Sequence, residues 1–317
     1  MTELLEGRVL RLDAKVCQVD LGDRVILAAP RGALFEHLDG VKNPIAVGDQ
    51  VLINPVGDPV HVYEVLPRKN HLSRVASSHD PREQVLFANV DQLLCFGSIK
   101  KPKFSSNRAD RILAACRYHE IPATLILNKI DLDKKGLAAE IEATYHAAGV
   151  EVLLTSVETG EGVDQVAELL RGKTSALYGA SGVGKSSLLN RIEPALQLKV
   201  GHISSHWAQG RHTTTYSQLH PIEALDAWIV DTPGIRVFRL HDVNTAELRD
   251  LFPEFAPYAG LCHFPDCTHT HEPDCGVLDA VEDEKLSVNR FASYIEMHDE
   301  AEPPPDYVPE AEPDVDP

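Results

Sequence analysis

Residues 179–186 of the chain read Gly179-Ala180-Ser181-Gly182-Val183-Gly184-Lys185-Ser186. This stretch fits the pattern G-x-x-x-x-G-K-[ST] at every fixed position, in which glycines let backbone N–H groups turn toward phosphate oxygens. Residues 175–178 before it form an apolar run typical of a strand, and residues 186–192 after it have helical spacing. The pattern therefore predicts a phosphate-binding loop that opens a helix in an α/β domain.

Two side chains of this loop have separate expected roles. We expect Lys185 to reach the β and γ phosphates of a nucleotide and the Ser186 hydroxyl to bind Mg²⁺. The remaining loop residues, and Ser187 after them, are assigned to nucleotide binding as well. A glycine-rich turn without a ligand is the alternative interpretation, and the flanking strand and helix argue against it.

A second polar group, Asn128-Lys129-Ile130-Asp131, follows the apolar run at residues 123–127. It should therefore emerge at the carboxyl end of a strand, where open α/β sheets bind ligands. Asp131 can accept hydrogen bonds from N1 and N2 of guanine, and adenine lacks that pair of donors. Asn128 would approach the N7/O6 side of the base and Lys129 would lie over the ring. Alone, the group is equally compatible with a solvated corner of the chain, and an ATP-using enzyme is the alternative that Asp131 disfavours.

Two further segments complete the expected nucleotide site. Asp231 and Gly234 follow the apolar run at residues 227–230, where Asp231 would hold Mg²⁺ through water and the Gly234 N–H would contact the γ phosphate. Thr155-Ser156 closes the run at residues 152–154 and would place backbone amides near the guanine O6. Val157 stands where GTPases usually have alanine, which matters little if the main chain makes the contact.

The guanine-reading group precedes the phosphate loop, whereas an ordinary GTPase has the opposite order. The chain resembles the RsgA family of circularly permuted GTPases, and residues 210–215 and 89–92 match that family's first switch and the first strand of its permuted domain. The resemblance implies a GTPase that binds the small (30S) ribosomal subunit and 16S rRNA. It would assist late maturation and couple GTP hydrolysis to docking and to release of assembly factors. The alternative is a GTP-regulated RNA or ribosome adaptor in which hydrolysis is incidental.

The expected architecture has several domains. Alternating apolar and polar runs between turns predict about five strands before residue 70, a pattern typical of a small β-barrel. The resemblance implies an OB-fold there, although small barrels also serve as protein-docking modules. We assign the OB-type barrel to residues 1–70, the circularly permuted P-loop GTPase domain to 71–238, a small α-helical zinc-binding module to 239–298 and a disordered acidic tail to 299–317.

Within the third part, helical periodicity is predicted at residues 245–251 and 284–297. Four potential metal ligands occur between these helices: Cys262, Cys267, His269 and Cys275. Three cysteines and one histidine at this spacing are typical of a closed, structural zinc site, and six cysteines in all fit a reducing compartment. His263 and His271 are rival ligands by spacing alone, and the family pattern selects His269.

Charge and hydropathy limit the partners and the location. The formal net charge is −18, but eight of the acidic residues lie after residue 298 with no basic residue among them. The GTPase segment is balanced, with eighteen basic and eighteen acidic residues from 71 to 238. It contains a local basic cluster, or alternatively a solvated helix start: Lys100, Lys101, Lys103, Arg108 and Arg111. No apolar run is long enough for a membrane span and no signal peptide is recognised, so we expect a cytoplasmic protein. We also expect a monomer.

The catalytic group is assigned from what the second switch lacks. Ile235 follows Gly234 where GTPases commonly have a glutamine, and an apolar side chain cannot orient water. His212 in the first switch is therefore the candidate, with a hinge or RNA-facing residue as the alternative. Thr214, among three adjacent threonines, is assigned to Mg²⁺ with a slight preference. We expect slow intrinsic hydrolysis that ribosome binding accelerates by ordering this switch.

Overall fold

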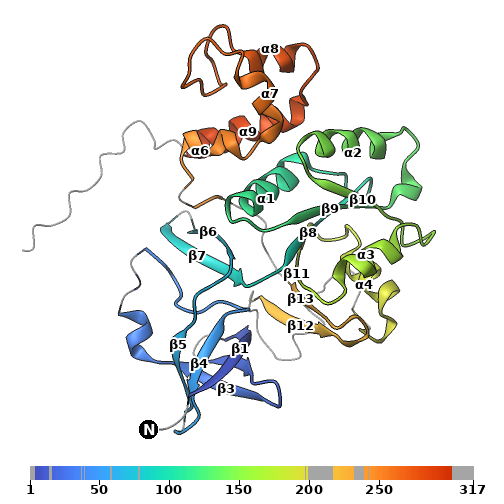
Figure 1. The fold of residues 1–317 in the computed structure, drawn as a ribbon. Coiled ribbons are helices and arrows are strands. Elements are labelled where there is room, and N and C mark those ends of the chain that lie inside the picture. Colours follow the sequence, from blue (N-terminus) through green and yellow to red (C-terminus); the bar gives the residue numbers. More distant parts are fainter. Residues whose placement is uncertain are drawn as a thin grey trace, which may run out of the picture.

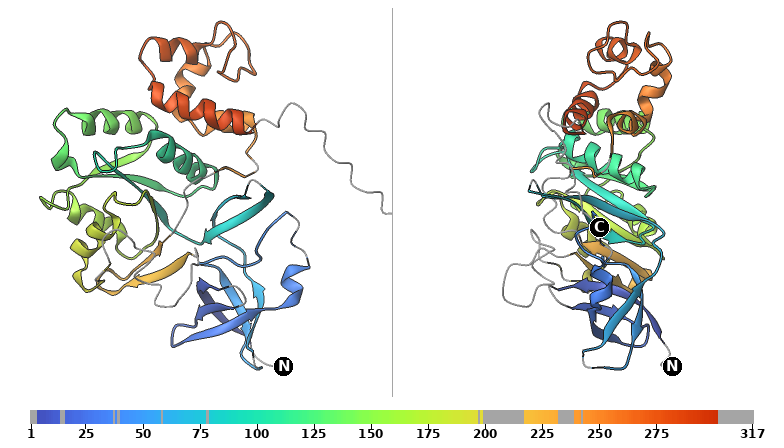
Figure 2. Two further views of the ribbon diagram at one scale, coloured as in Figure 1. Left: turned by 180° about the vertical axis from the view of Figure 1, so that it is seen from behind. Right: turned by 90° about the vertical axis from the view of Figure 1, so that its left-hand side faces the viewer.

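The computed structural model describes residues 4–13, 16–36, 38, 40–57, 59–77, 79–196, 198, 217–231, 239–241 and 243–301. The three expected parts are stacked in a row, with the barrel at one end, the α/β domain in the middle and a helical module at the other end (Figures 1 and 2). The expected fold class is confirmed, and no helix of the described residues combines the length and apolar character needed to cross a bilayer.

The N-terminal part is a closed barrel of five strands. They are β1 (Leu5–Leu12), β2 (Cys17–Asp20), β3 (Val25–Pro30), β4 (Gln50–Asn54) and β5 (His61–Val65). Their order is β1-β2-β3-β5-β4, and β4 returns to pair with β1. Alternate residues such as Val9, Val51 and Ile53 fill the interior with no exposed surface, as period-2 strands require. A short 3₁₀ turn, η1 (Gly32–Phe35), follows β3.

The middle part is a sheet of six strands. Five are parallel, in the order β10 (Glu151–Leu154), β9 (Ala123–Asn128), β8 (Gln92–Ser98), β11 (Thr174–Gly179) and β13 (Ala227–Asp231), and β12 (Gln218–Ile222) runs antiparallel beside β13. Every residue of β8 is buried, because helices cover both faces of a parallel sheet. The two helix layers are α1 (Ser106–Tyr118) with α2 (Leu137–Ala147), and α3 (Val163–Leu170) with α4 (Lys185–Ile192). Short 3₁₀ turns lie at Ile130–Leu132, Pro194–Leu196 and Glu223–Leu225.

A separate hairpin, which the sequence analysis did not predict, lies between the barrel and the helical module. Its strands are β6 (His71–Ser77) and β7 (Asp80–Ala88), and they form a two-stranded sheet of their own. Barrel residues Val41 and Val47 pair with Glu83 and Phe87 of this hairpin. The segment 71–88 therefore borders the barrel directly and does not belong to the parallel sheet.

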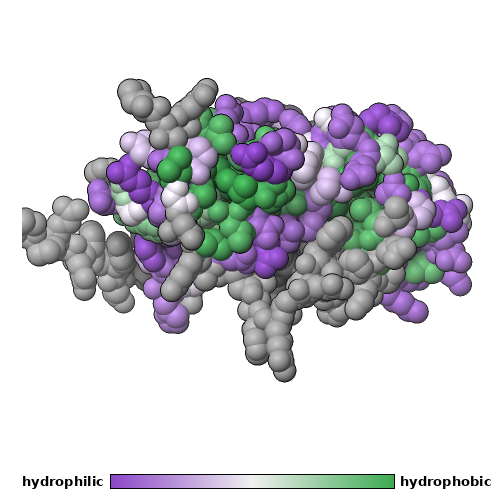
Figure 3. Space-filling view, turned by 90° about the horizontal axis from the view of Figure 1, so that it is seen from below, coloured by the Kyte–Doolittle hydropathy of each residue, from purple (hydrophilic) through white to green (hydrophobic). Residues whose placement is uncertain are grey.

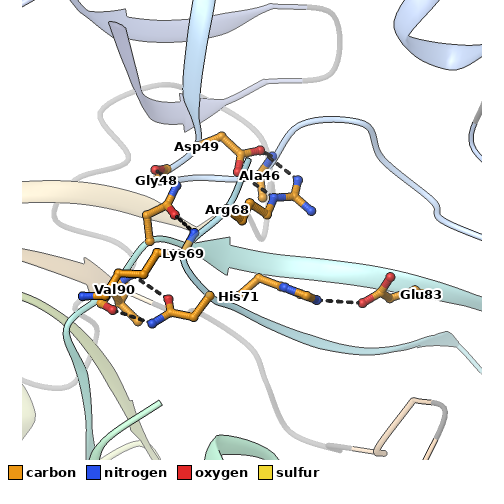
Figure 4. Close-up of polar contacts among 10 residues, drawn as sticks. Ala46, Gly48, Asp49, Arg68, Lys69, His71, Glu83 and Val90 are labelled. Carbon is orange, nitrogen blue, oxygen red and sulfur yellow. Dashed lines mark hydrogen bonds and ion pairs between the residues drawn. The ribbon is translucent and has the colours of Figure 1, made fainter. Parts of the chain in front are cut away.

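The junction between barrel and middle domain is built from buried polar contacts (Figure 4). Asp49, which has no exposed surface, accepts hydrogen bonds from Arg68 Nε at 2.7 Å and Nη2 at 2.8 Å. The Asn89 amide donates to the Gly48 carbonyl at 3.0 Å. These contacts fix the direction in which the chain leaves the barrel, because Asp49 is fully buried and Arg68 binds it through two hydrogen bonds.

The barrel also continues the sheet of the middle domain. Strand β1 pairs with β12 at Arg11 and Gln218, so the two sheets form one run of strands. Arg8 on β1 donates to Thr174 Oγ1 at 2.9 Å, and its guanidinium lies 5.6 Å from the centre of the Trp228 ring. The barrel is thus attached to the middle domain along β12, the strand that directly precedes β13.

The C-terminal module consists of helices around an aromatic core. They are α6 (Thr245–Asp250), η5 (Pro253–Phe255), α7 (Ala256–Ala259), α8 (Gly276–Glu282) and α9 (Val288–Ala301). Asn244 and Glu247 form a reciprocal capping box that starts α6, which matches the predicted helix. Helix α9 starts after the predicted residue 284 and continues through Ala301, so residues 299–301 are helical although we assigned them to the tail. The rest of that tail, residues 302–317, lies outside the described residues.

Salt bridges hold the end of α9 against α1 and explain this difference. Arg111 Nη1 and Nη2 donate to the Glu300 carboxylate at 2.6 and 2.8 Å, and Arg239 donates to the Glu300 carbonyl at 2.7 Å. Arg111 therefore does not belong to an open basic cluster. The sequence analysis could not foresee this, because its partner lies 189 residues away.

A buried ionic network lies at the centre of the same interface. Arg290 of α9 donates to Asp110 of α1 at 2.8 Å and to Glu254 at 2.7 Å, and the side chains of all three are at most 6% exposed. Tyr145 of α2 also donates to Asp110, at 2.7 Å. Removing one member would leave an uncompensated buried charge, so the network fixes the module in a single position on α1 and α2.

Figure 3 shows an apolar area on the barrel end of the molecule. The barrel carries five of the large apolar side chains that are exposed among the described residues: Val25, Leu27, Phe35, Val56 and Tyr63. Its outer surface is consequently apolar over part of β3 and β5.

The barrel junction yields a stability prediction with a matched control. Gly48 and Gly22 both have left-handed backbones, with φ of +91° and +89°. A Cβ at Gly48 would lie 2.1 Å from the Ala88 carbonyl oxygen, whereas nothing lies within 4 Å of one at Gly22. We expect Gly22→Ala to cost about 1 kcal/mol. Gly48→Ala should cost about 1–3 kcal/mol more, because the hairpin must be displaced.

Thermal unfolding followed by circular dichroism measures both variants under one set of conditions. Equal melting temperatures for the two variants would contradict the packing of the hairpin against Gly48.

Candidate nucleotide-binding site and metal centre

The phosphate loop has the predicted strand–loop–helix context. β11 ends at Gly179 and α4 begins at Lys185. The Lys185 ammonium donates to the carbonyls of Gly179 at 2.5 Å and Ala180 at 3.2 Å, which places it on the inner side of the loop. Ser186 lies in the first turn of α4 and is 6% exposed. This arrangement fits an anion at the helix N-terminus, with a hydroxyl suited to Mg²⁺ beside it.

Residues 128–131, which the sequence analysis expects to contact guanine, lie beside the phosphate loop although the two segments are far apart in the chain. The Asn128 amide at the end of β9 donates to the Val183 carbonyl at 2.9 Å and accepts from Thr155 Oγ1 at 3.2 Å. A Cβ at Gly184 would lie 2.1 Å from Asn128 Nδ2, so only glycine permits this approach. Asn128 thereby fixes the two loops relative to each other.

Lys129 adds a second bridge between the same loops. Its backbone is left-handed, with φ of +64°, which turns the side chain back over the phosphate loop. Its ammonium donates to the Gly182 carbonyl at 2.5 Å and to the Lys101 carbonyl. Burial lowers the pKa of Lys129, and the nearby Asp131 carboxylate opposes that effect. The loop after β8 therefore takes part in the site, which sequence patterns did not indicate.

Asp131 is oriented by the loop that follows β10. The Ser156 hydroxyl, with no exposed surface, donates to Asp131 Oδ1 at 2.6 Å, and the Thr159 N–H donates to the same hydroxyl at 3.2 Å. One carboxylate oxygen is thus held while the residue remains exposed. The sequence analysis expected only the backbone near Ser156 to matter. The serine side chain was the missed signal, because a small hydroxyl at a strand end can orient a carboxylate.

The remaining predicted nucleotide residues are described only in part. Asp231 ends β13 and pairs in register with Leu177 of β11, so its backbone lies beside the strand that leads into the phosphate loop. His212, Thr214 and Gly234 lie outside the described residues.

The four predicted metal ligands come together in the C-terminal module. Their ligand atoms all lie within 4.8 Å of one another. Cys262 Sγ is 3.8 Å from Cys275 Sγ, and His269 Nδ1 is 3.5 and 3.4 Å from these two sulfurs. A tetrahedral zinc ion with bonds of about 2.3 Å to sulfur and about 2.0 Å to nitrogen separates such atoms by about 3.8 and 3.5 Å. The residues therefore fit zinc, and the rival His263 and His271 are not in the group.

A carboxylate holds the loop that carries His269. Glu272 accepts hydrogen bonds from the Thr268 N–H and hydroxyl, both at 2.6 Å, and from the N–H groups of Thr270 and His271 at 3.1 and 3.2 Å. Burial alone would raise the pKa of Glu272, but these hydrogen bonds hold it below its ordinary value. Burial also lowers the pKa of His269, which favours the neutral imidazole that binds a metal.

Comparisons with known proteins place this geometry in a family. The family model described as RsgA GTPase matches residues 65–241. A protein named small ribosomal subunit biogenesis GTPase RsgA from Bacteroides fragilis is 33% identical, with 94% of this chain and 97% of the relative covered. The protein of the same name from Chlorobaculum tepidum is 34% identical, with 94% and 99% covered.

Two solved structures share the fold over nearly the whole chain. The crystal structure of YjeQ from Thermotoga maritima has a TM-score of 0.71 and 31% identity, covering 94% of this chain and 99% of that one. The crystal structure of YloQ, described as a circularly permuted GTPase, has a TM-score of 0.65 and 27% identity, with 94% and 95% covered. The permuted order of motifs is therefore shared with these proteins.

The metal centre yields a prediction about Glu272. We expect Glu272→Gln to release zinc to a competing chelator at about 10- to 100-fold lower chelator concentration, because the loop carrying His269 loses its charged acceptor. Glu282→Gln is the matched control, since Glu282 is exposed on α8 and lies outside the ligand loop. Zinc is measured with a chromophoric chelator. Identical release curves for both variants would show that Glu272 does not organise the site.

Proposed function

Because the chain belongs to the RsgA GTPase family and is a GTP-hydrolysing enzyme, we propose that it acts in biogenesis of the small ribosomal subunit. The observation that carries the nucleotide half of this proposal is the hydrogen bond from Asn128 to the Val183 carbonyl. It joins the loop that we propose reads the base to the loop that we propose binds the phosphates, despite their permuted order. The printed names of the relatives support the ribosomal half.

In the proposed site, each loop binds one part of GTP. The backbone of residues 179–184 and the Lys185 ammonium bind the phosphates. Ser186 and Asp231 would bind Mg²⁺, which would neutralise charge on the β and γ phosphates. Asp131 accepts from guanine N1 and N2, aided by the Ser156 hydrogen bond at 2.6 Å. Lys129 lies over the base. We propose that the remaining nucleotide contacts are made by Ala180, Ser181, Ile130, Ser187, Thr214 and Gly234.

Hydrolysis in this proposal needs a group that positions water. Water attacks the γ phosphorus, the bond to the β–γ bridging oxygen breaks, and GDP and phosphate form. Lys185 stabilises the charge that develops on the phosphates. Ile235 cannot hold the water, so His212 takes that role when the partner orders the first switch.

The family also suggests the partners of the protein. We propose that the protein docks on the small subunit through 16S rRNA and that GTP hydrolysis releases it together with assembly factors. The zinc held by Cys262, Cys267, His269 and Cys275 has a structural role. The boundaries at residues 70, 238 and 298, a cytoplasmic location and a monomeric state remain part of the proposal.

The function is tested by GTP turnover with and without purified small subunits. We expect at least about tenfold stimulation, because switches ordered by a partner commonly gain far more than that. His212→Ala should abolish the stimulation while GDP affinity is retained. Unstimulated turnover in the presence of bound subunits would favour a nucleotide-regulated adaptor, and stimulation that survives in His212→Ala would overturn only the histidine assignment.

Base selectivity yields a separate prediction. Asp131→Asn should weaken GTP binding by about 10- to 100-fold, because the pair of hydrogen bonds to a charged acceptor is lost. ATP binding should change little, so the preference for GTP over ATP should fall.

Glu158→Gln is the control, since it removes an exposed negative charge two residues after Ser156. Competition titrations with a fluorescent guanine nucleotide measure both variants. An unchanged preference for GTP in Asp131→Asn would contradict the guanine assignment.

A further inference from the structure

The loop between β8 and α1, residues 99–105, has a fixed inner side. The Ile99 N–H donates to the Asn128 carbonyl at 3.1 Å, and the Ser98 hydroxyl donates to the Pro102 carbonyl at 2.7 Å. Phe104 packs so closely that a Cβ at Gly97 would lie 2.6 Å from its ring. The loop is therefore a fixed platform at the edge of the nucleotide site.

The outer side of this platform and the first turn of α1 carry positive charge. Lys100, Lys101, Lys103 and Arg108 are exposed, and none of them makes a side-chain hydrogen bond or ion pair with the described part of the chain. β9 lies beside β8, so the loop after β9 adjoins the same edge. The described lysines and arginines that lack such a partner are Arg31, Lys100, Lys101, Lys103, Arg108, Lys134, Lys135 and Arg191. All but Arg31, which lies over the Tyr63 ring, and Arg191 follow β8 or β9.

The barrel differs in this respect, although OB-type barrels often bind oligonucleotides. Each of its described cations already contacts another group of the protein: Arg8 with Thr174, Arg11 with Asp13, Arg24 with Asp23, Arg31 with Tyr63, Lys42 with Asp80, Arg68 with Asp49 and Lys69 with Asp91. Its exposed surface is partly apolar instead. Free cations for phosphate contacts are thus concentrated on the middle domain.

We propose that Lys100, Lys101, Lys103 and Arg108 form a cation patch that binds the phosphate backbone of RNA beside the nucleotide pocket. The proposal rests on the proposed function for its source of RNA. Unpaired cations favour a polyanion, since each phosphate contact releases condensed counterions. The large apolar side chains that are exposed among the described residues lie in the barrel and the module, so this platform offers none to a protein or a membrane.

The patch is connected to nucleotide binding through its backbone. The Lys101 carbonyl accepts a hydrogen bond from the Lys129 ammonium, which also contacts Gly182 of the phosphate loop. RNA that binds this loop therefore acts on the group expected to cover the guanine base. Binding of RNA and of nucleotide should be coupled, and the coupling is reciprocal.

The test uses the full chain with Lys100→Gln, Lys103→Gln and Arg108→Gln combined, which leaves Lys101 and its carbonyl in place. Affinities for a labelled 20-base-pair RNA duplex and for purified small subunits are measured between 50 and 300 mM KCl. At 100 mM KCl we expect the variant to bind both RNA probes at least about tenfold more weakly than the unaltered protein does. The slope of log affinity against log salt concentration should be smaller by about 2, since up to three phosphate contacts are lost.

A control variant removes the same charge elsewhere. Arg24→Gln, Arg171→Gln and Lys285→Gln combined replace three paired cations whose side chains are 58%, 51% and 57% exposed. This variant should bind both RNA probes like the unaltered protein, apart from a small general effect of net charge. Equal losses in the two triple variants would show that only net charge matters and would overturn the patch.

The remaining outcomes separate this inference from the proposed function. If the unaltered protein binds subunits and the patch variant binds both probes with the same affinity and salt slope, the patch is wrong and the proposed function stands. If the unaltered protein fails to bind subunits but binds the duplex through the patch, the proposed function is wrong and the patch stands. If the patch variant instead loses affinity for GDP with RNA binding intact, the cations serve nucleotide phosphates and the RNA assignment is overturned.

Discussion

The close approach of Asn128 to the phosphate loop is the contact on which the functional architecture depends. The asparagine amide bonds to the Val183 carbonyl at 2.9 Å, and no side-chain atom at Gly184 stands in the way. β8 and β11 are neighbours in the sheet, so the ends of β9 and β11 face the same edge. A change in chain order leaves this contact intact, because the pocket depends on which strand ends are adjacent and not on which is synthesised first.

Much of this arrangement could be predicted because its signals are local. The strand before the phosphate loop, the helix after it and the polar end of β9 each follow from a few consecutive residues. The spacing of Cys262, Cys267 and Cys275 likewise indicated a metal centre, whereas the choice of His269 came from the family pattern. Five barrel strands followed from turns and alternating residues, although spacing alone does not specify how such strands close.

The contacts that join the three parts could not be predicted in this way. Arg290 meets Asp110 across 180 residues of sequence, and Arg111 meets Glu300 across 189. The hairpin at residues 71–88 pairs with barrel loops and lacks a pattern that separates it from the strands of the sheet. Each case depends on a partner distant in the chain, so local propensity and periodicity do not indicate the contact. The same pairings determine which cations remain free, so the basic cluster expected from the sequence loses Arg111 and keeps Lys100, Lys101, Lys103 and Arg108.

The continuous run of strands from the barrel into the middle domain has a consequence for biosynthesis. β1 is among the first segments to leave the ribosome, but β12, with which it pairs at Gln218, emerges only after most of the middle domain. β8 similarly emerges before its partner β11. Until then β8 has one unpaired edge, and β1, which already pairs with β2 and β4, lacks its partner at Arg11. Unpaired edges are prone to faulty association in long β-rich chains. The finished sheet thus requires nearly the full chain, and a truncated product would retain open edges that distinguish it from the native protein.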